Sequence, residues 1–335
     1  MTTPPYRLCE AHVGSHPSAV RLLPTFDLQR LLADLKTLDG HQWALQQTFE
    51  TDGPAEEADF DWRALPLRSP TGSELRTDPG GAGLDDFADT KWLAEAPYLA
   101  EVLASIPAPL RCVRLLALGP GAQSELHFDT KIGFPWGNLR LHVPLVTNPG
   151  ATLLMDGDVH VWEPGTFWFG DFCRLHQVEN TGTRKRVHMV IDTTLTPEVL
   201  SLFPAEFLEA LDADEVLFNR PAVPCDDLAR HQCEFEVPLS FLDFEEAEGE
   251  FTKPQEHLPA SVRIDGDRLV LAVSGEPRFG LVHVGDGEFR FSGWTDERTV
   301  QVLPGGDRAT VVLRTRQGTR EQRLDVPAVV GAPAV

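Results

Sequence analysis

Short runs of apolar residues, or of apolar residues alternating with polar ones, fill the middle of the chain and predict β-strands. Turn sequences such as Gly119-Pro120-Gly121 and Asn148-Pro149-Gly150 separate these runs. Strands of this kind at regular spacing are typical of a β-sandwich or barrel, so we expect a mainly β core over residues 111–196. The expected strands are Arg111–Leu118, Ser124–Asp129, Leu139–Val146, Ala151–Met155, Val159–Trp162, Thr166–Phe169 and Arg186–Thr193.

Outside the core, helical spacing alternates with turn-rich sequence. Leucines from Leu28 to Leu38 recur at helical spacing, with Thr25 as the expected N-cap and Gly40 at the end. Two more helices are expected over Lys91–Ser105 and Pro197–Leu211. Residues 41–50 and 62–68 resemble strands, and residues 69–89 read as a long loop of the kind that often forms a lid.

This pattern divides the chain into four parts. Residues 1–110 are expected to form an α/β cover, and residues 111–196 the β core. Residues 197–258 are expected to be a helix followed by an acidic connector. Residues 259–335 contain short strand-like runs around Asp265-Gly266-Asp267 and Gly285-Asp286-Gly287, and predict a small separate all-β unit.

Charge follows the same division. The chain of 335 residues carries a formal net charge of −22. Residues 1–110 hold 17 acidic and 8 basic side chains and residues 197–260 hold 16 and 3, whereas residues 111–196 hold 8 of each. So acidic a chain repels nucleic acid and anionic membranes, and we expect neither as a partner. The β core itself is neutral.

Nothing in the sequence predicts export or membrane insertion. The N-terminal residues lack a basic start followed by an apolar run, and no stretch approaches the roughly 20 apolar residues of a membrane span. The five cysteines include no Cys-x-x-Cys pair. Free thiols in a reducing compartment are therefore expected, which predicts a cytoplasmic protein. The oligomeric state is not evident from the sequence.

The candidate chemistry lies in the neutral core. On a strand, His127 and Asp129 of His127-Phe128-Asp129 would project to the same face, and His176 follows 49 residues later. Two histidines and one carboxylate on one face of a metal are the triad of non-haem Fe(II) oxygenases, which leaves three coordination positions open. A His-x-Asp sequence alone is common by chance, so the neighbouring motifs decide its weight.

Three basic side chains accompany this triad. Arg186 stands ten residues after His176, and its planar fork suits a carboxylate; the alternative is a solvated basic turn with Arg184 and Lys185. Arg140 and His142 alternate with leucines and share one face of a strand. Inside a small barrel such polar groups would serve a ligand, whereas on an edge strand they would simply face solvent.

The stretch Arg114–Ile191 resembles the catalytic domain of the aspartyl/asparaginyl β-hydroxylase family, which includes bacterial proline hydroxylases. The resemblance covers about 80 of the 335 residues, and the order and spacing of its motifs make it specific. Members are Fe(II)- and 2-oxoglutarate-dependent dioxygenases, and the resemblance implies a double-stranded β-helix of the jelly-roll or cupin type. The matching motifs are Arg114-Leu115-Leu116, Gly119-Pro120-Gly121, His127-Phe128-Asp129, Leu139–Leu145, Pro164–Phe169, His176–Asn180 and Arg186–Asp192.

The resemblance also implies roles for single residues. His127, Asp129 and His176 match the iron ligands, and Arg186 matches the arginine that binds the distal carboxylate of 2-oxoglutarate. Arg140 and His142 match a strand pair that helps to hold this co-substrate. Arg114 and His188 match positions of the bacterial proline hydroxylases that serve either co-substrate or substrate.

Two positions depart from the mammalian members. Those proteins have a glycine in place of the triad carboxylate, whereas this chain has Asp129, as the bacterial ones do. They also use a serine on the strand before the His-x-Asp motif to hold the co-substrate. Here that position is Leu116, so the contact must be absent or replaced, with Arg114 as a candidate.

The implied reaction converts 2-oxoglutarate and O₂ to succinate and CO₂ and hydroxylates an unactivated carbon. The expected substrate is an Asp- or Asn-type residue in a peptide, or a free amino acid such as proline, in bacterial specialised metabolism. Three alternatives stay open: a cupin-like isomerase without 2-oxoglutarate, a non-catalytic metal-binding module, and a jumonji-type protein hydroxylase. Cys173 is expected to be a packed thiol, and Trp136, Trp162 and Trp168 are expected to be core or barrel-rim aromatics. A zinc site at Cys225, His231 and Cys233 lacks a fourth ligand.

Overall fold

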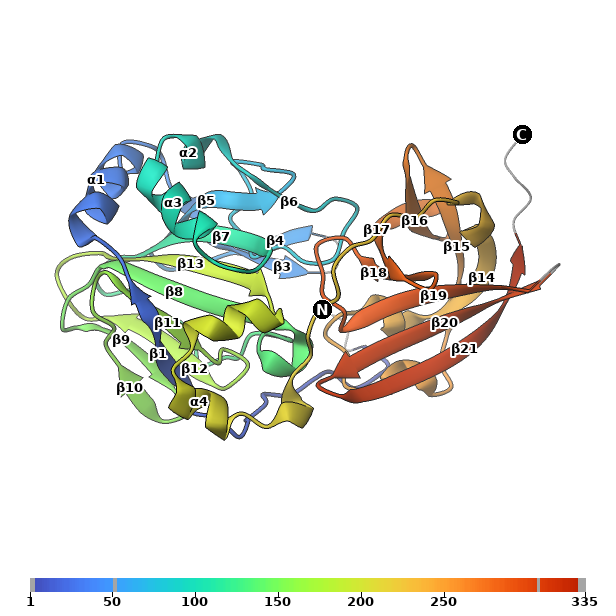
Figure 1. Ribbon diagram of the computed structural model, residues 1–335. Coiled ribbons are helices and arrows are strands. Elements are labelled where there is room, and N and C mark those ends of the chain that lie inside the picture. The colour runs from blue at the N-terminus through green and yellow to red at the C-terminus, as the bar shows by residue number, and fades with distance from the viewer. Residues whose placement is uncertain (1–3, 51–52, 306–307, 331–335) are drawn as a thin grey trace.

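The structure, a computed structural model, describes residues 4–50, 53–305 and 308–330. Two β units lie side by side, one blue to yellow in Figure 1 and the other orange to red. Among the helices of the described residues, none is both long enough and apolar enough to cross a membrane.

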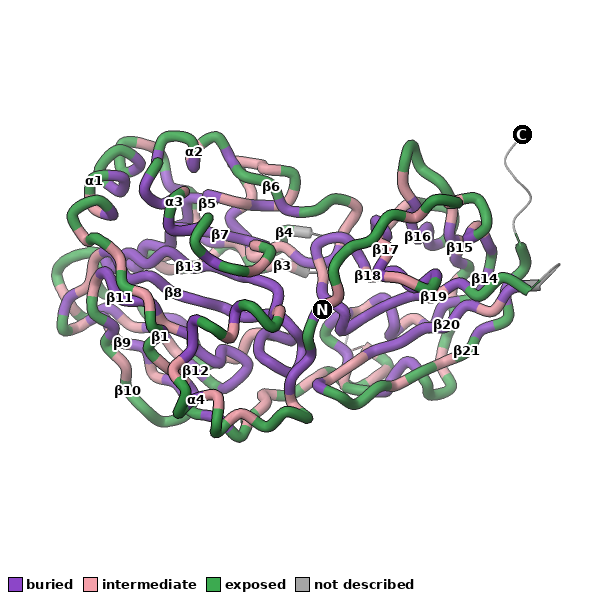
Figure 2. The backbone as a smooth tube through the Cα atoms, viewed as in Figure 1, coloured by how far each residue is buried: buried purple, intermediate pink, exposed green. Residues whose placement is uncertain are grey.

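An eight-stranded antiparallel sheet forms the main wall of the first unit. Its order is β1-β11-β8-β13-β7-β5-β2, with β6 paired to β5. The central strands β7, β8 and β13 are buried along nearly their whole length (Figure 2). The bounds are β1 Ala19–Thr25, β2 Ala44–Leu45, β5 Trp62–Pro70, β6 Phe87–Asp89, β7 Leu110–Leu118, β8 Asn138–Val146, β11 Thr166–Gly170 and β13 Arg186–Thr194.

A three-stranded sheet faces this wall. It consists of β10 (Asp158–His160), β9 (Ala151–Met155) and β12 (His176–Asn180). An apolar cluster that includes Leu118 of β7 and Met155 of β9 packs between the two sheets. Two facing antiparallel sheets joined in this way form the double-stranded β-helix, so the expected fold is confirmed.

Helices cover the outer face of the larger sheet. They are α1 (Leu28–Leu38), α2 (Lys91–Ala94) and α3 (Pro97–Ala104), and they share a core with the leucine face of β8. The observed N-cap of α1 is Asp27 rather than Thr25, since the Asp27 carboxylate accepts from the backbone N–H groups of the first turn. The cap was therefore predicted two residues too early.

Proline splits two helices that the sequence pattern joined. The expected helix over 91–105 is α2 and α3, with Pro97 at the start of the second. The expected helix over 197–211 is a 3₁₀ helix, η2 (Pro197–Leu202), and a short α4 (Ala205–Ala210), separated at Pro204. Proline has no N–H to continue a helix and is tolerated only in its first turn, so each proline starts a new element.

The second unit is a closed antiparallel barrel. Its strands follow one another in sequence order and β21 pairs back to β14. Phenylalanine, valine and leucine side chains fill the interior. The bounds are β14 Cys233–Pro238, β15 His257–Asp265, β16 Arg268–Val273, β17 Glu276–Gly285, β18 Glu288–Phe291, β19 Arg298–Gly305, β20 Arg308–Gln317 and β21 Arg320–Val330.

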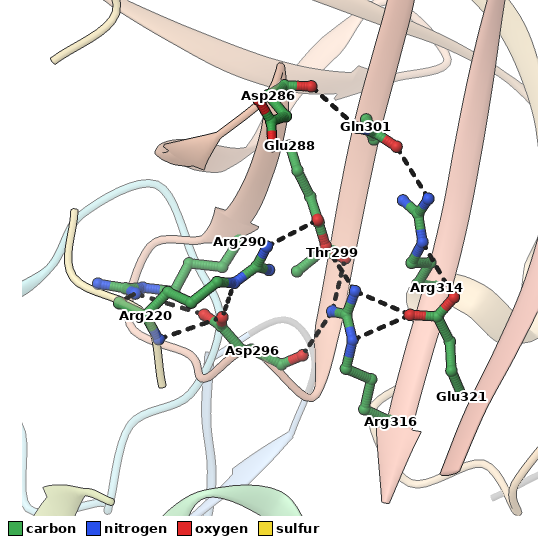
Figure 3. Close-up of polar contacts among 10 residues, drawn as sticks. All are labelled: Arg220, Asp286, Glu288, Arg290, Asp296, Thr299, Gln301, Arg314, Arg316 and Glu321. Atoms are coloured by element: carbon green, nitrogen blue, oxygen red, sulfur yellow. Dashed lines mark hydrogen bonds and ion pairs between the residues drawn. The ribbon is translucent and has the colours of Figure 1, made fainter. Parts of the chain in front are cut away.

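A polar network attaches the preceding connector to this barrel (Figure 3). Glu288 of β18 accepts from Arg220 of the connector at 2.8 Å and from Arg316 of β20 at 2.8 Å. Asp296 accepts from Arg220 at 2.5 Å. The connector therefore contributes to the barrel through side chains as well as backbone.

The units differ from the expected division in two ways. Strands β1, β2, β5 and β6 of the expected cover are part of the main sheet, because long-range pairing places β1 beside β11 and β5 beside β7. Strand β14 of the expected connector closes the barrel, which therefore begins at Cys233 rather than at residue 259. Residues 331–335 lie outside the described residues.

The remaining elements are short. A hairpin of β3 (Gln47–Glu50) and β4 (Gly53–Glu57) lies between the two units in Figure 1. The further 3₁₀ helices are η1 Phe134–Trp136, η3 Ala213–Glu215, η4 Ala229–His231, η5 Leu239–Leu242 and η6 Glu250–Thr252.

Candidate active site

Three ligand-type side chains meet at the open end of the smaller sheet. One ligand atom from each of His127, Asp129 and His176 lies within 4.8 Å of the other two. The segment over Ser124–Asp129 is not the regular strand that was predicted. Instead, His127 forms an isolated bridge with His176, in which each backbone N–H donates to the other residue's carbonyl, at 3.0 and 2.7 Å. This bridge brings the two imidazoles together.

The hydrogen bonds of both imidazoles fit a metal site. Nδ1 of His127 lies 2.8 Å from the Glu125 carbonyl, and Nδ1 of His176 lies 2.9 Å from the Arg174 carbonyl. Because a carbonyl only accepts, each Nδ1 must carry the proton, and each Nε2 then presents a lone pair. Two such nitrogens with one carboxylate match the donor set of non-haem Fe(II), so the residues present fit that ion.

Asp129 is held by an arginine that binds two carboxylates. Nη1 of Arg140 donates to Oδ2 of Asp129. The other side of the same guanidinium donates to Asp192 of β13, with Nε–Oδ1 at 2.7 Å and Nη2–Oδ2 at 2.9 Å. Burial alone would raise the pKa of Asp129, but Arg140 and then His176 hold it below its ordinary value. Asp129 is therefore ionised, and its Oδ1 is directed toward His127, 3.9 Å from Nε2.

Arg186 is a buried cation with no acidic partner among the described residues. Its side chain is in the cavity wall, and Nη2 lies 2.8 Å from Nδ1 of His188. Burial lowers the pKa of Arg186 to about 10, so the guanidinium is still charged at neutral pH. A buried charge without a counter-ion is costly, and an anionic ligand would remove that cost.

Two neutral histidines stand beside Arg186. Nδ1 of His142 lies 3.3 Å from Nδ1 of His188. Burial, and next the charge of Arg186, places the pKa values of both imidazoles well below the ordinary range. Because Arg186 can only donate, Nδ1 of His188 must accept, and the proton between the histidines belongs to His142. Nε2 of His142 is then buried without a hydrogen-bond partner among the described residues.

These groups line one cavity of about 960 Å³. Seven of the eight predicted site residues are among the described residues of its wall. The eighth, His188, lies behind the wall, beside Arg186. Arg140 and His142 are buried on a central strand, which excludes the solvent-facing alternative for them, and the 6 % exposure of Arg186 excludes a solvated turn. The wall residues from the predicted set are His127, Asp129, His176, Arg114, Arg140, His142 and Arg186.

Sequence reasoning missed several residues of this cavity. Asp192 lies directly opposite Arg140 in the β13–β8 ladder, and its even spacing from Arg186 on the same strand was an available signal. Arg111 also lines the cavity, as do Phe244 and Trp294 from beyond the first unit. No local pattern marks these three, because a bulge and the docking of the second unit bring them there.

The other candidates occupy structural positions. Cys173 is buried, its thiol lies 3.0 Å from Asp171 Oδ1, and burial together with that carboxylate raises the pKa of the thiol well above its ordinary value. Trp162 stacks on Trp168 between the sheets. Trp136 packs against His12 where the two units meet.

Comparison with protein families gives one match. A family model described as Aspartyl/Asparaginyl beta-hydroxylase matches residues 25–195, about half of the chain. That range holds all eight predicted site residues. No curated protein matches the chain.

Solved structures with a similar arrangement have distant sequences. A 2OG-Fe(II) oxygenase family oxidoreductase from Burkholderia pseudomallei is 12% identical, with 53% of this chain and 85% of that chain covered and a TM-score of 0.39. A prolyl hydroxylase from Trichoplax adhaerens, solved with a hypoxia inducible factor peptide fragment, is 11% identical, with 53% and 83% covered and a TM-score of 0.34. A predicted oxalate decarboxylase from Thermotoga maritima is 20% identical, with 28% and 73% covered and a TM-score of 0.22. At these TM-scores the function rests on the family match and on the site.

Proposed function

The chain belongs to the aspartyl/asparaginyl β-hydroxylase family, and from that premise we propose that it hydroxylates an unactivated carbon of an amino-acid side chain, either in a peptide or in a free amino acid. It is a 2-oxoglutarate-dependent hydroxylase whose cofactor and co-substrates are Fe(II), 2-oxoglutarate and O₂. The family match favours this activity over the isomerase, the binding module and the jumonji-type enzyme that the sequence left open.

The observation that carries the proposal is the buried, uncompensated Arg186 in the same cavity as the His127–Asp129–His176 group. Fe(II), when bound with 2-oxoglutarate and O₂, supplies the oxidising chemistry that replaces C–H by C–OH while 2-oxoglutarate becomes succinate and CO₂. The two Nε2 atoms and Oδ1 of Asp129 would hold the metal, and Arg186 would hold the distal carboxylate of the co-substrate.

The neighbouring residues have supporting tasks. Arg140 fixes the orientation of Asp129, so that one carboxylate oxygen stays free for the metal. His142 and His188 are neutral and do not compete with Arg186 for the co-substrate's negative charge. The aromatic walls of the cavity, among them Trp62 and Phe172, exclude water from the reacting atoms.

The setting we propose is a reducing compartment such as the cytoplasm, within bacterial specialised metabolism. The five cysteines are free in the structure, which is compatible with a reducing compartment. The bacterial part of this proposal is supported by Asp129, because the bacterial members of the family share this carboxylate and the mammalian members lack it.

Anaerobic titration with Fe(II) and 2-oxoglutarate tests the proposal. The intact protein should show the weak visible charge-transfer absorption of the chelate. Arg186→Met should weaken 2-oxoglutarate binding by about a hundredfold, because a buried charge pair is lost. His176→Ala should abolish the band, and Arg30→Gln, at an exposed residue outside the site, should leave it unchanged. If the intact protein gives no band, the assignment fails.

The substrate requires a separate screen. Free amino acids and Asp- or Asn-containing peptides are incubated with Fe(II), 2-oxoglutarate and O₂, and succinate is counted beside the product mass. Hydroxylation adds one oxygen atom, so the product should be heavier by 16 Da and equal in amount to the succinate. A mass gain without succinate would contradict the reaction class.

A further inference from the structure

Four arginines line the cavity. The family resemblance left Arg114 open between co-substrate and substrate, and it gave Arg111 no role. Arg140 binds Asp129 and Asp192, and Arg186 is assigned to the co-substrate. Arg111 and Arg114 lie in the same wall, are 6% and 2% exposed, and have no ion pair with a carboxylate among the described residues. Two buried guanidinium groups without an acid are an unusual cost for a fold, and they need an explanation.

Arg114 is anchored on one side only. Its Nη1 donates to the Gln46 side chain at 2.8 Å and to the Thr77 carbonyl at 3.1 Å. Its Nε is buried and has no hydrogen-bond partner among the described residues. The anchor fixes the guanidinium plane while a charged donor is left unused.

Arg111 is fixed in a similar way, but by the second unit. Its Nη2 donates to the Gly293 carbonyl at 2.6 Å. Its guanidinium carbon lies 5.2 Å from the Trp294 ring centre and 5.5 Å from that of Phe87. Nε and Nη1 are buried and unpartnered among the described residues. Arg111 and Arg114 together thus leave three buried donor nitrogens without a hydrogen-bond partner among the described residues.

A β-bulge explains how both arginines reach one cavity. Residues three apart on a regular strand face opposite sides of the sheet. In the β7–β13 ladder, Val113 pairs with Ile191 and Leu110 pairs with Thr193, so Arg111 and Cys112 together oppose Asp192. The extra residue shifts the alternation and brings Arg111 to the side of Arg114.

The turn that holds Arg111 is itself docked on the first unit. The backbone carbonyl of Ser292, the residue before Gly293, accepts a hydrogen bond from the backbone N–H of Gly83 at 3.1 Å. Gly293 has φ +71°, and a Cβ there would lie 2.4 Å from the Gly81 carbonyl oxygen, so only glycine allows this approach. The position of Arg111 therefore depends on the barrel.

We propose that Arg111 and Arg114 bind a carboxylate of the substrate, and that the C-terminal barrel completes this second carboxylate site through Gly293 and Trp294. The inference rests on the proposed function and narrows it: the substrate carries a carboxylate, bound at the same time as the distal carboxylate of 2-oxoglutarate at Arg186. An uncharged side chain flanked by amide bonds could accept hydrogen bonds from these donors but would leave the two buried guanidinium charges without a counter-ion.

The test uses the full-length protein with Fe(II) and saturating 2-oxoglutarate, without O₂. Free L-amino acids and an Asp-containing peptide are titrated in, each beside the analogue in which a carboxamide replaces the carboxylate. A shift in the wavelength of the charge-transfer band reports binding near the metal. We expect at least one carboxylate compound to shift the band, and we expect its amide analogue to bind at least about tenfold more weakly.

Variants separate the site from the rest of the protein. Arg111→Gln and Arg114→Gln should weaken that response at least about tenfold while 2-oxoglutarate binding stays unchanged. Arg111→Lys, which keeps the charge within the ring sandwich, serves as a second variant if Arg111→Gln does not fold. Arg30→Gln is the matched arginine control outside the cavity.

Each contrary outcome overturns the inference. The site is wrong if acid and amide bind alike, if the variants respond as the parent does, or if no carboxylate compound in the panel binds. In all these outcomes the band itself is present, so the proposed function stands. Loss of the band from the parent protein would instead reject the proposed function.

Discussion

At the scale of single residues, the partners of each arginine decide its task. Arg140 and Arg186 occupy neighbouring strands and line the same cavity. Two carboxylates neutralise Arg140, whereas no carboxylate of the described residues pairs with Arg186. Arg140 was expected to hold the co-substrate, and the structure supports a different proposal, in which it positions Asp129. A guanidinium already engaged by Asp192 on two donors has little capacity left for a mobile ligand.

Asp192 can be tested as a positioning residue. Asp192→Asn removes one charge from the Asp192–Arg140–Asp129 chain, so Arg140 should be held less firmly and Asp129 less well oriented. We expect Fe(II) affinity to fall by about tenfold or more, as for other residues behind metal ligands. Anaerobic Fe(II) titration measures this. Asp325→Asn, at an exposed carboxylate paired with Arg323, is the control, and equal iron affinity in both variants would contradict the role.

At the scale of elements, small irregularities place the functional groups. The triad histidine His127 is on an isolated bridge and not on a strand, and Arg111 is on a bulge. Regular alternation predicted Arg140 and His142 correctly because β8 has no bulge in that region. Where an extra residue interrupts a ladder, strict alternation along the sequence predicts the wrong side of the sheet for the side chains beyond it.

At the scale of elements, Glu288 of β18 can be tested through the pH dependence of stability. Hydrogen bonds from Arg220 and Thr299, together with Arg316, outweigh the effect of burial and hold the pKa of Glu288 below its ordinary value. A carboxylate with a lowered pKa stabilises the fold above its unfolded pKa of about 4.3, and that stability is lost as pH falls through the folded value.

Glu288→Gln should therefore lower the free energy of unfolding by about 2–3 kcal/mol at pH 7. The difference from the parent should shrink as the pH falls below about 4.3, where the parent's own Glu288 begins to lose this contribution. Denaturant unfolding at a series of pH values measures it. A difference that is constant between pH 7 and pH 3 would show that the charge of Glu288 contributes nothing.

At the scale of the whole molecule, a buried ionic cluster joins the two units. Lys131, two residues after the metal-type ligand Asp129, donates to Glu246 and to Glu297, both at 3.0 Å. Arg298 of the barrel completes the cluster through Glu246. All four side chains are at most 5% exposed, so the loop of the first unit is tied to the second one inside the protein.

Lys131→Met tests this connection. The change leaves two buried carboxylates with one cation, and we expect a loss of about 3–5 kcal/mol in unfolding free energy. The double variant Lys131→Met/Glu297→Gln removes the excess charge and should recover part of that loss. Denaturant unfolding of Lys131→Met, Glu297→Gln and the double variant beside the parent provides the measurement. An unaffected single variant, or a double variant as unstable as the sum of the two changes, would contradict the coupling.

The charge distribution leads to a prediction about substrates. Most exposed residues of the cavity wall are acidic, whereas the arginines of the wall are buried. The exposed acidic residues are Glu56, Glu57, Asp59, Glu125 and Glu245. If the substrate is a peptide, basic residues beside the target should raise kcat/KM about tenfold or more at low salt, and added salt should reduce the advantage. Equal turnover of acidic and basic peptides at low salt would reject this expectation.

The sequence by itself determined the β core, the metal-type triad and the ligand face of β8. These features depend on local periodicity and on the spacing of a few polar residues, which can be read along the chain. The outward leucines of β8 and the inward Arg140 and His142 follow from alternation alone.

Only the tertiary structure decided which partners the arginines have, where the barrel begins and which groups close the cavity. Asp192 contacts Arg140 across a strand pair, and a bulge places Arg111 on the cavity side of its sheet. Trp294 belongs to a turn more than 180 residues after Arg111 in the sequence. Such contacts follow from strand pairing and unit docking, which optimise packing over the whole molecule and leave no local pattern. The triad could therefore be predicted from the sequence. The residues around it, which we propose select the substrate, could not.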